Sequence, residues 1–243
     1  MVFSVHHWAA WAPGLFGQDA WRSWLSKPHP LPSEGTPPLT EMPPMMRRRV
    51  DRLGRIALQA AYTCQADAPA CPLVFASRYG DMGRSVDLLE QLARSTPLSP
   101  TSFSLSVHNA IGGLYSIARG DLTAQSAVAA GAETVEAAFV EACGLLGEGA
   151  PEVVVIVYDE PRPAPFQHFP EQTSLAHAWA CSVRPAGDGP RFRLSCGAAE
   201  GVPPAPTPEG LPEELSVLRF LVLGDARLER VLGSRLWRWE RDV

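Results

Sequence analysis

The chain has 243 residues, of which 46% are hydrophobic and 19% are charged, and its formal net charge is −5. This composition is that of a globular protein with a substantial core, and it argues against intrinsic disorder. The negative balance also argues against a nucleic-acid-binding protein, because such proteins normally present a basic surface.

The cysteines do not form a recognisable zinc or disulfide pattern. They are five in number, none stands at CxxC spacing, and an odd count does not suit a disulfide framework; they are Cys64, Cys71, Cys143, Cys181 and Cys196. We therefore expect no metal, no cofactor and a reduced, cytoplasmic setting. No apolar run reaches about 18 residues, so stable membrane insertion is not expected, although the tryptophans near the start leave peripheral contact open.

The first part of the chain predicts a strand, a helix and a long loop, followed by a second helix. Residues 2–5 have strand character, and Trp21 and Trp24 lie three residues apart, as on a short helix. Residues 27–46 are dense in proline, which blocks helix interiors and central strands, so they predict a loop. Apolar residues at helical spacing predict a helix over residues 47–64.

The middle of the chain alternates between short apolar runs and helical patterns. Residues 72–81 begin as a buried strand and end in a glycine turn, and residues 83–95 predict a helix. Residues 97–104 predict a loop. Small apolar residues over 110–120 predict a helix packed closely on a neighbour, and residues 127–149 turn at a glycine into an amphipathic helix.

The last part begins with the strongest strand signal of the chain. Residues 152–160 are a nearly continuous β-branched run, which is typical of a strand buried on both faces. Residues 175–185 and 191–198 alternate in polarity and predict strands near a sheet edge. Residues 201–212 form a second proline-rich loop, and residues 213–243 predict one helix or two.

Strands therefore alternate with helices, and no linker or internal repeat divides the chain. This order predicts an α/β fold in which a layered sheet carries helices on both faces. We expect residues 1–243 to form a single domain.

The stretch from Ser106 to Phe139, "SVHNAIGGLYSIARGDLTAQSAVAAGAETVEAAF", raises a chemical question. Small residues, a turn, more small residues and a helix are typical of a strand that bends sharply into a helix and presents a nucleophile at the bend. This stretch contains no cysteine where the bend is expected.

Several segments resemble, in this order, the β-ketoacyl synthases of the thiolase superfamily. "RRRVDRLGRIALQAAY" is similar to their first long helix, "FASRYGDMG" to their second strand with its glycine turn, and "EVVVIVYDE" to the strand after the nucleophile helix. In "SVHNAIGGLYSIARG", Asn109, Gly113, Ile117 and Gly120 are in register with a segment of the family. The resemblance implies a thiolase-like layered fold that corresponds to roughly one half of a ketoacyl synthase.

The family's acyl-accepting residue is the cysteine of a Thr-Ala-Cys-x-x-Gly motif, activated at a helix N-terminus. If Gly131 matches the final glycine, the motif lies on "SAVAAG" and Val128 takes the place of the cysteine. A register shifted by three residues places Gln125 there, as in many larger chain-length factors. Neither register contains a thiol, and His168 and His177 come too early to match the histidines of the family's second half.

The resemblance is most specific to the short chain-length factors of aryl polyene clusters, and it implies a subunit with no catalytic residues. Such a subunit would form a heterodimer with a full-length ketoacyl-ACP synthase, which condenses acyl groups with malonyl units delivered by acyl carrier protein. The residues expected at the dimer interface or along the partner's tunnel are Phe103, His108, Asn109, Ala110, Gly112, Gly113 and Val128. The small residues among them would permit close backbone approach.

Two other functions stay open. A Ser-dependent acyl-thioester enzyme would use Ser126 as the nearest candidate nucleophile, but the chain lacks the GxSxG pattern of such enzymes. A carrier-protein docking or scaffold module would use Arg47, Arg48 and Arg49, because acyl carrier proteins are acidic. A solvated helix start explains the same three arginines.

Overall fold

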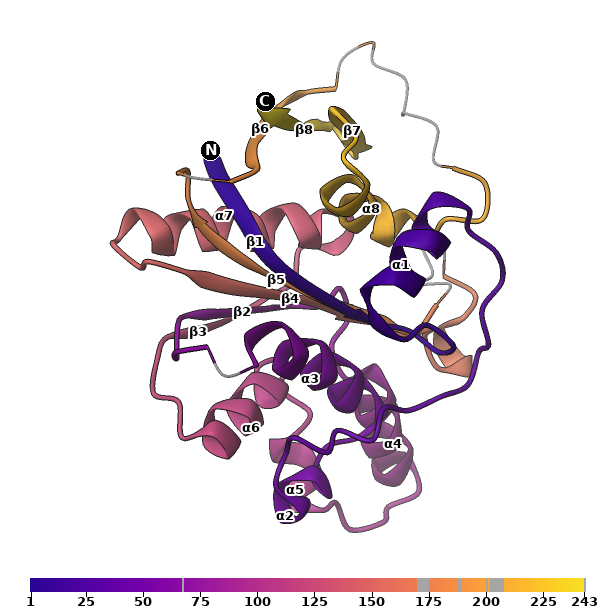
Figure 1. The fold of residues 1–243 in the computed structure, drawn as a ribbon. Helices are drawn as coiled ribbons and strands as arrows, with labels where there is room; N and C mark the ends of the chain where they lie inside the picture. Colours follow the sequence, from indigo (N-terminus) through magenta and orange to yellow (C-terminus); the bar gives the residue numbers. More distant parts are fainter. Residues whose placement is uncertain (67, 170–174, 188, 200, 202–207, 243) are drawn as a thin grey trace.

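The computed structural model describes residues 1–66, 68–169, 175–187, 189–199, 201 and 208–242 (Figure 1). Its helices are α1 (Gly17–Ser26), α2 (Pro44–Arg47), α3 (Arg52–Gln65), α4 (Met82–Ala93), α5 (Pro100–Ser104), α6 (Ala110–Arg119), α7 (Thr134–Gly147) and α8 (Ser216–Leu223). Its strands are β1 (Val2–Trp11), β2 (Leu73–Ala76), β3 (Gln125–Val128), β4 (Val153–Asp159), β5 (His177–Pro185), β6 (Arg191–Ala198), β7 (Arg227–Leu232) and β8 (Arg235–Asp242).

The strands form one mixed sheet in the order β3-β2-β4-β5-β1-β6-β8-β7. The strand β2 is parallel to both of its neighbours, β3 and β4. All the other neighbouring pairs are antiparallel. The predicted class, an α/β sheet with helices on both faces, is confirmed.

The strand β4 explains why the sheet is covered on both faces. All seven of its residues are buried. Successive side chains of a strand point to opposite faces. The side chains of Val153, Val155 and Val157 therefore enter one core together with α7, and those of Val154, Ile156 and Tyr158 enter the other together with α3 and α6.

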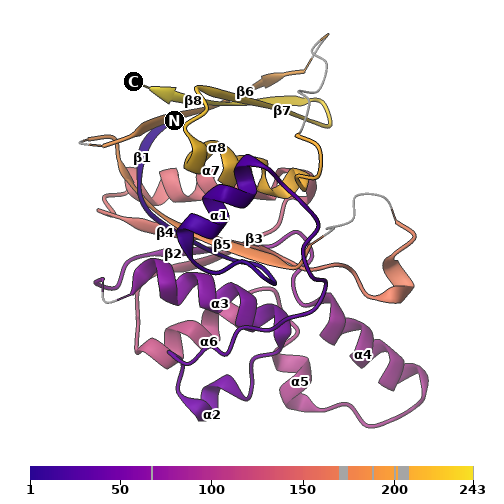
Figure 2. The same ribbon diagram turned by 45° about the vertical axis from the view of Figure 1, so that its right-hand side comes forward.

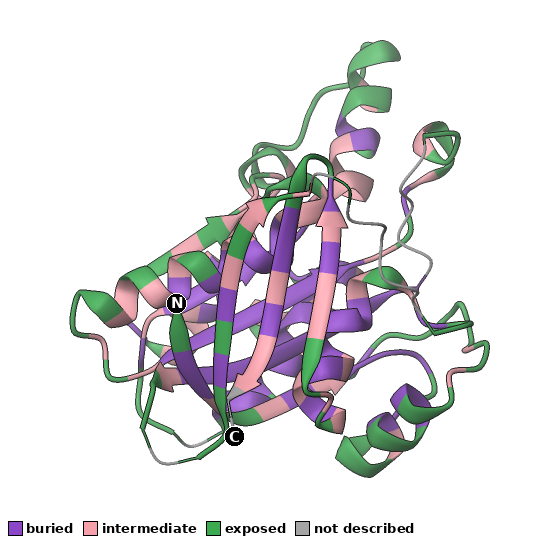
Figure 3. Cartoon of the chain, turned by 90° about the horizontal axis from the view of Figure 1, so that it is seen from above, coloured by how far each residue is buried: buried purple, intermediate pink, exposed green. Residues whose placement is uncertain are grey.

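The sheet curls around α7, so that this helix lies between two parts of the same sheet (Figure 2). Phe139 of α7 has its ring 6.3 Å from Trp179 of β5 and 4.9 Å from Trp239 of β8. The outer face of the C-terminal strands stays open, and β6 alternates between exposed and buried residues along its first half (Figure 3). The fold is therefore layered as helices, sheet, helices and a second sheet region.

A buried ion pair ties the C-terminal strands to α7. Arg230 of β7 donates to the Glu136 carboxylate over 2.6 Å, and both side chains are almost completely buried. The indole of Trp239 also donates to Glu136, over 3.3 Å. A charge in the core needs such a partner, because burial without one is costly.

The prediction of one or two helices over residues 213–243 is wrong beyond Leu223. The helix α8 ends at Gly224, whose φ of +86° is the left-handed conformation common after a helix C-terminus. The chain then forms the hairpin of β7 and β8, joined by Gly233 and Ser234. A two-residue Gly-Ser connection is a hairpin signal that the sequence does carry.

Other boundaries also differ from the prediction. The helix expected from residue 47 begins at Arg52 and is capped by Asp51, and the short helix α2 precedes it. The segment 97–104 contains α5. The strand β5 lies inside the sheet between β4 and β1, because its antiparallel pairing continues on both sides. Residues 202–207 of the second proline-rich loop lie outside the described residues.

We expect Arg230→Ala to lower the free energy of unfolding by about 3–5 kcal/mol, because it leaves the Glu136 carboxylate buried without a cation. Urea denaturation measures the loss. The matched control is Arg227→Ala on the same strand, whose exposed pair with Glu229 is expected to contribute less than about 1 kcal/mol. Equal losses in the two variants would contradict a structural role for the buried pair.

Candidate functional site

The candidate site lies where the parallel strands β2, β3 and β4 end at the same edge of the sheet. Residues Ser77–Gly80 follow β2, Ala129–Gly131 follow β3, and Asp159 ends β4. The carboxyl ends of neighbouring parallel strands are the usual position of binding sites in open α/β sheets. The site is therefore built from three loops that the sheet holds side by side.

The chain turns from β3 into α7 at Gly131, whose φ is +58°. Thr134 fixes this turn, since its hydroxyl accepts from the Ala130 amide over 3.0 Å and donates to the Gly131 carbonyl over 2.7 Å. The Arg78 guanidinium donates to the same carbonyl over 3.2 Å. The bend is thus held from both β2 and α7.

The chain turns at Gly131, the glycine at which the sequence predicts the turn, and the two registers for the missing cysteine stay predictions. Val128 is the last residue of β3 and pairs with Ala76, and Gln125 is the first residue of the same strand. Both lie before the turn, because the ladder with β2 continues to Val128. The residue with the left-handed conformation at the turn is Gly131. The bend itself reads Ala-Ala-Gly and carries neither a thiol nor a hydroxyl.

Asp159 organises the loop after β2. Its carboxylate accepts from the Ser77 hydroxyl over 2.8 Å and from the Arg78 amide over 3.0 Å. The Ser77 hydroxyl in turn accepts from the Gly80 amide over 2.8 Å. Burial raises the pKa of Asp159, although the nearby His177 and these hydrogen bonds act in the opposite direction. Because its oxygens are occupied by the loop, the carboxylate has a structural role.

His108 connects the loop after β2 to the end of β3. Its Nε2 lies 3.3 Å from the Val128 carbonyl oxygen. Its Nδ1 lies 2.6 Å from where a Cβ on Gly80 would be, and Gly80 has a φ of +62°, so a side chain is excluded there for two reasons. The sequence-predicted candidates His108 and Val128 are therefore in contact with each other.

The other predicted interface or tunnel residues lie on α5 and α6. Phe103 of α5 is 63% exposed, and Asn109 is exposed just before α6. On α6, Ala110 is half-buried, and Gly113 has open space where a Cβ would lie. A Cβ on Gly112 would lie 2.4 Å from Gln125 Oε1, so this glycine lets α6 approach β3 within the chain.

Ser126 does not form a nucleophile–base pair. Its hydroxyl donates to the Glu141 carboxylate of α7 over 2.6 Å. A hydroxyl that donates to a carboxylate without a histidine lacks the base of a hydrolase triad. The geometry thus disfavours a Ser-dependent enzyme.

The three arginines predicted at the start of a helix are placed in and after α2 instead. The Arg47 guanidinium donates to the Leu39 carbonyl over 3.2 Å, and its own carbonyl accepts from Arg55. Arg48 and Arg49 are exposed in the turn before α3. Arg47 is half-buried, so Arg48 and Arg49 are the more accessible of the three.

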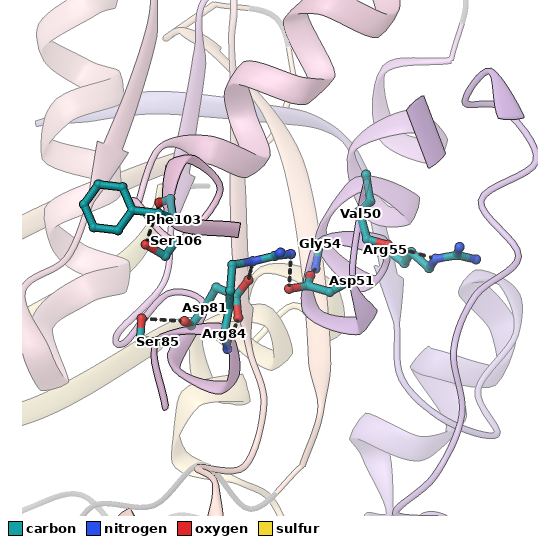
Figure 4. A network of polar contacts seen from close by, with 9 residues as sticks. All are labelled: Val50, Asp51, Gly54, Arg55, Asp81, Arg84, Ser85, Phe103 and Ser106. Atoms are coloured by element: carbon teal, nitrogen blue, oxygen red, sulfur yellow. Dashed lines mark hydrogen bonds and ion pairs between the residues drawn. The ribbon is translucent and has the colours of Figure 1, made fainter. Parts of the chain in front are cut away.

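Two aspartates that the sequence prediction missed share one arginine beside the site (Figure 4). Asp51 caps α3 by accepting from the Gly54 amide, and Asp81 caps α4 by accepting from the Arg84 amide. The Arg84 guanidinium bonds Asp81 over 2.7 Å and Asp51 over 2.9 Å. Each aspartate is a helix-start signal in the sequence, but their meeting depends on the tertiary fold.

The two carboxylates affect each other's ionisation. Burial and the neighbouring Asp51 raise the pKa of Asp81 to about 7. Burial opposes ionisation of Asp51 as well, but the hydrogen bonds that it accepts and the Arg84 cation keep its pKa below the usual range. The pair borders a cavity of about 280 Å³ that Asp87 and Glu160 also line.

Across the described residues, no three His, Cys, Asp or Glu side chains are grouped so as to hold a metal ion. A search of the same residues finds no helix whose length and apolar character would allow it to cross a membrane. The sequence expectations of no metal, no cofactor and no membrane insertion stay predictions.

We expect the stability of the protein to fall as the pH rises through about 7, because a folded-state pKa above that of the unfolded state means that ionising Asp81 costs stability. Arg84→Met removes the shared cation, so its free energy of unfolding should decline more steeply between about pH 5 and pH 8. Urea denaturation over this range is the measurement. The control, Arg94→Met, breaks an exposed pair with Glu90, and a slope in Arg84→Met no steeper than in this control would refute the expectation.

Comparisons with known proteins identify the family and the fold of the chain. A family model described as β-ketoacyl synthase, N-terminal domain, matches residues 21–240. A chain of the complex of the ketosynthase ApeO with its chain length factor ApeC from Xenorhabdus doucetiae is 22% identical, with a TM-score of 0.85, and the match covers 99% of this chain and 100% of that one. A chain of the ishigamide ketosynthase/chain length factor is 15% identical, with a TM-score of 0.75 and 99% coverage of both chains.

A longer relative shows the same fold over part of its length. The ketosynthase from module 6 of the bacillaene synthase of Bacillus subtilis 168 is 11% identical, with a TM-score of 0.56, over 85% of this chain and 43% of that one. No curated protein matches the chain. The fold is thiolase-like, and the resemblance predicted from the sequence is confirmed. Since the family model spans most of its length, the chain belongs to the family of β-ketoacyl synthase N-terminal domains.

Proposed function

We propose that this chain is a chain-length-factor-like subunit that has no nucleophile of its own and forms a heterodimer with a full-length ketoacyl-ACP synthase. The observation that carries the proposal is an open sheet edge at β3, directly before a bend that reads Ala-Ala-Gly. The bend is kept in a defined geometry by Thr134 and Arg78 although no reactive group stands there. A partner would supply the thiol.

The edge of β3 has the properties of an interface. Its residues carry no formal charge, and Gln125 and Ala127 are exposed. Leu122 is 99% exposed just before β3, and Ile117 of α6 is 70% exposed. Exposed apolar side chains beside an unpaired strand mark a surface that pairs with another chain.

The opposite edge of the sheet is built differently. The strand β7 carries Arg227 and Glu229, which pair with each other over 2.6 Å, and Glu229 also pairs with Arg238 of β8. Charged side chains on an edge strand discourage pairing with another chain. The contrast supports β3, rather than β7, as the partner-binding edge.

In such a heterodimer the partner synthase would join acyl groups to malonyl units carried by acyl carrier protein, in the cytoplasm. This chain would shape the substrate tunnel from across the interface, with Phe103, His108 and Asn109 nearest to the partner. The likeness to the ApeO–ApeC complex supports polyketide-type elongation, as in aryl polyene synthesis. Fatty-acid-type elongation uses the same chemistry.

A second role, docking of the carrier protein, is favoured by one observation. Arg48 and Arg49 are exposed side by side in a turn, and their charges face solvent. Two adjacent cations suit an acidic partner. We propose this role as an addition to the heterodimer function.

Co-expression with the full-length ketoacyl synthase encoded nearest to this chain is expected to give a one-to-one heterodimer in native mass spectrometry, and the complex is expected to condense malonyl units. Leu122→Asp should weaken the heterodimer by about tenfold or more, because it places a charge where an apolar contact forms. Met45→Asp, a change of another exposed apolar residue, is the matched control. A stable monomer beside every such synthase would contradict the proposal.

Replacing Arg48 and Arg49 by glutamate is expected to weaken binding of acyl carrier protein by roughly threefold to tenfold at low salt, since each exposed charge contributes little by itself. Fluorescence anisotropy with labelled carrier protein measures the affinity. Arg94→Glu, a charge reversal at the exposed residue that follows α4, is the control. Binding that is insensitive both to these changes and to salt would exclude docking at the arginines.

A further inference from the structure

The strand β1 is longer than its pairing with β6. On one side it pairs with β5 as far as Trp11, but on the other side β6 pairs with it only over Val2–Ser4. In Figure 2, β1 runs from β6 down to the layer of β4 and β5. Within the described residues, no strand covers this side of β1 beyond Ser4. The second half of β1 is thus a local sheet edge in the middle of the strand order.

The backbone groups of this edge point away from β5. The Trp8 carbonyl accepts a hydrogen bond from the Gln18 side-chain amide over 2.7 Å, so it faces away from β5. The N–H and C=O of one residue in an antiparallel ladder point to the same side, and sides alternate along the strand. The backbone groups of Ala10 therefore point in the same direction as those of Trp8. Gln18 takes the place that a neighbouring strand would occupy at Trp8.

A groove of about 660 Å³ runs along this edge. It is lined by residues 7–11 of β1, by residues 15–18 before and in α1, by residues 37, 38, 40 and 41 of the proline-rich loop, by the last turns of α3 and by residues 66 and 68 after this helix. Five consecutive residues of β1 line it, so it follows the strand edge and not one face of the sheet. Its apolar walls include Trp8, Trp11 and the 78% exposed Phe16.

The charge of the groove limits what can bind there. Among the residues that line it, Glu41 is the one with a formal charge at neutral pH when histidine is counted as neutral. The Glu41 carboxylate accepts a hydrogen bond from the side-chain amide of Gln59. This amide is neutral, so it does not balance the negative charge of Glu41. A ligand of complementary charge would place a cation beside Glu41.

We propose that this groove binds an extended peptide segment of a partner protein, which adds a strand to the free edge of β1. Main-chain hydrogen bonds to Ala10, and to Trp8 where the peptide displaces the Gln18 amide, would hold the peptide. Its apolar side chains at alternate positions would contact Trp8, Trp11 and Phe16. A lysine or arginine of the peptide would lie near Glu41. The groove is separated from the β3 edge by β2, β4 and β5, so this proposal goes beyond the heterodimer function.

To test this proposal, heptapeptides displayed on phage are selected for binding to the full chain. The affinity of each selected peptide is then measured by calorimetry. Selected sequences are expected to alternate apolar residues and to carry a basic residue at one end. Hydrogen exchange at the Ala10 amide should slow when such a peptide binds. Phe16→Ser, a change of an exposed side chain, should weaken binding by about fivefold, and Ala10→Pro, which removes the donor, by about tenfold or more.

Matched controls separate strand pairing from apolar adhesion. Ala10→Ser keeps the amide and should bind like the wild type. N-methylation of alternate peptide amides should abolish binding, and this control holds even if Ala10→Pro fails to fold. The proposal would be overturned if a peptide still binds whether its odd-numbered or its even-numbered amides are methylated. A selection that yields no peptide would also overturn it. If the wild-type chain associates with itself and Ala10→Pro abolishes this association, the edge binds a second copy of the chain. That result would also overturn the proposal.

Discussion

Packing on both sides of one helix is the constraint on which the rest of this structure depends. α7 is apolar almost all round, so it must be buried on more than one side. Phe139 meets that need by touching Trp179 of the main sheet region and Trp239 of the C-terminal hairpin. The sheet therefore curls until its last strands cover the helix, and the ion pair of Glu136 with Arg230 holds them there.

The same constraint positions the candidate site. Because α7 is fixed along its length, the turn that precedes it is fixed as well, and Thr134 and Arg78 bond the turn to the helix and to the loop after β2. Asp159 and His108 hold that loop against the ends of β3 and β4. The result is a bend held in one geometry by hydrogen bonds from both sides, and its own residues, Ala-Ala-Gly, carry neither a thiol nor a hydroxyl.

The sequence patterns predict the elements whose signals are local. β4 follows from its β-branched run, α3 and α6 follow from helical spacing, and the order of the motifs leads to the family. The C-terminal hairpin was missed because buried Arg230 interrupts the apolar alternation of β7, and its partner Glu136 lies on a distant helix. The turn at Gly131 was predicted from its glycine, but the bounds of the strand before it were not, because they depend on the ladder of β3 with β2.

Contacts between distant segments account for what the sequence could not provide. The meeting of Asp51 and Asp81 at Arg84 joins two helix caps, each of which reads as an ordinary local feature. The open edge of β1 depends on where its pairing with β6 stops, and the residue types of the two strands do not show that point. Gln65 is a polar residue on the apolar face of α3. Its buried side chain accepts a hydrogen bond from the Tyr115 hydroxyl, a partner 50 residues away that the sequence does not reveal.

The left-handed backbone of Gly131 bears on how such a protein could change over evolutionary time. A side chain at Gly131 would have to adopt a conformation that costs a residue other than glycine about 1–2 kcal/mol. Val128, which takes the place of the family's cysteine in one register, is the last residue of β3 and lies outside this left-handed turn. The turn into α7 therefore restricts substitution at Gly131 far more than it restricts substitution at Val128.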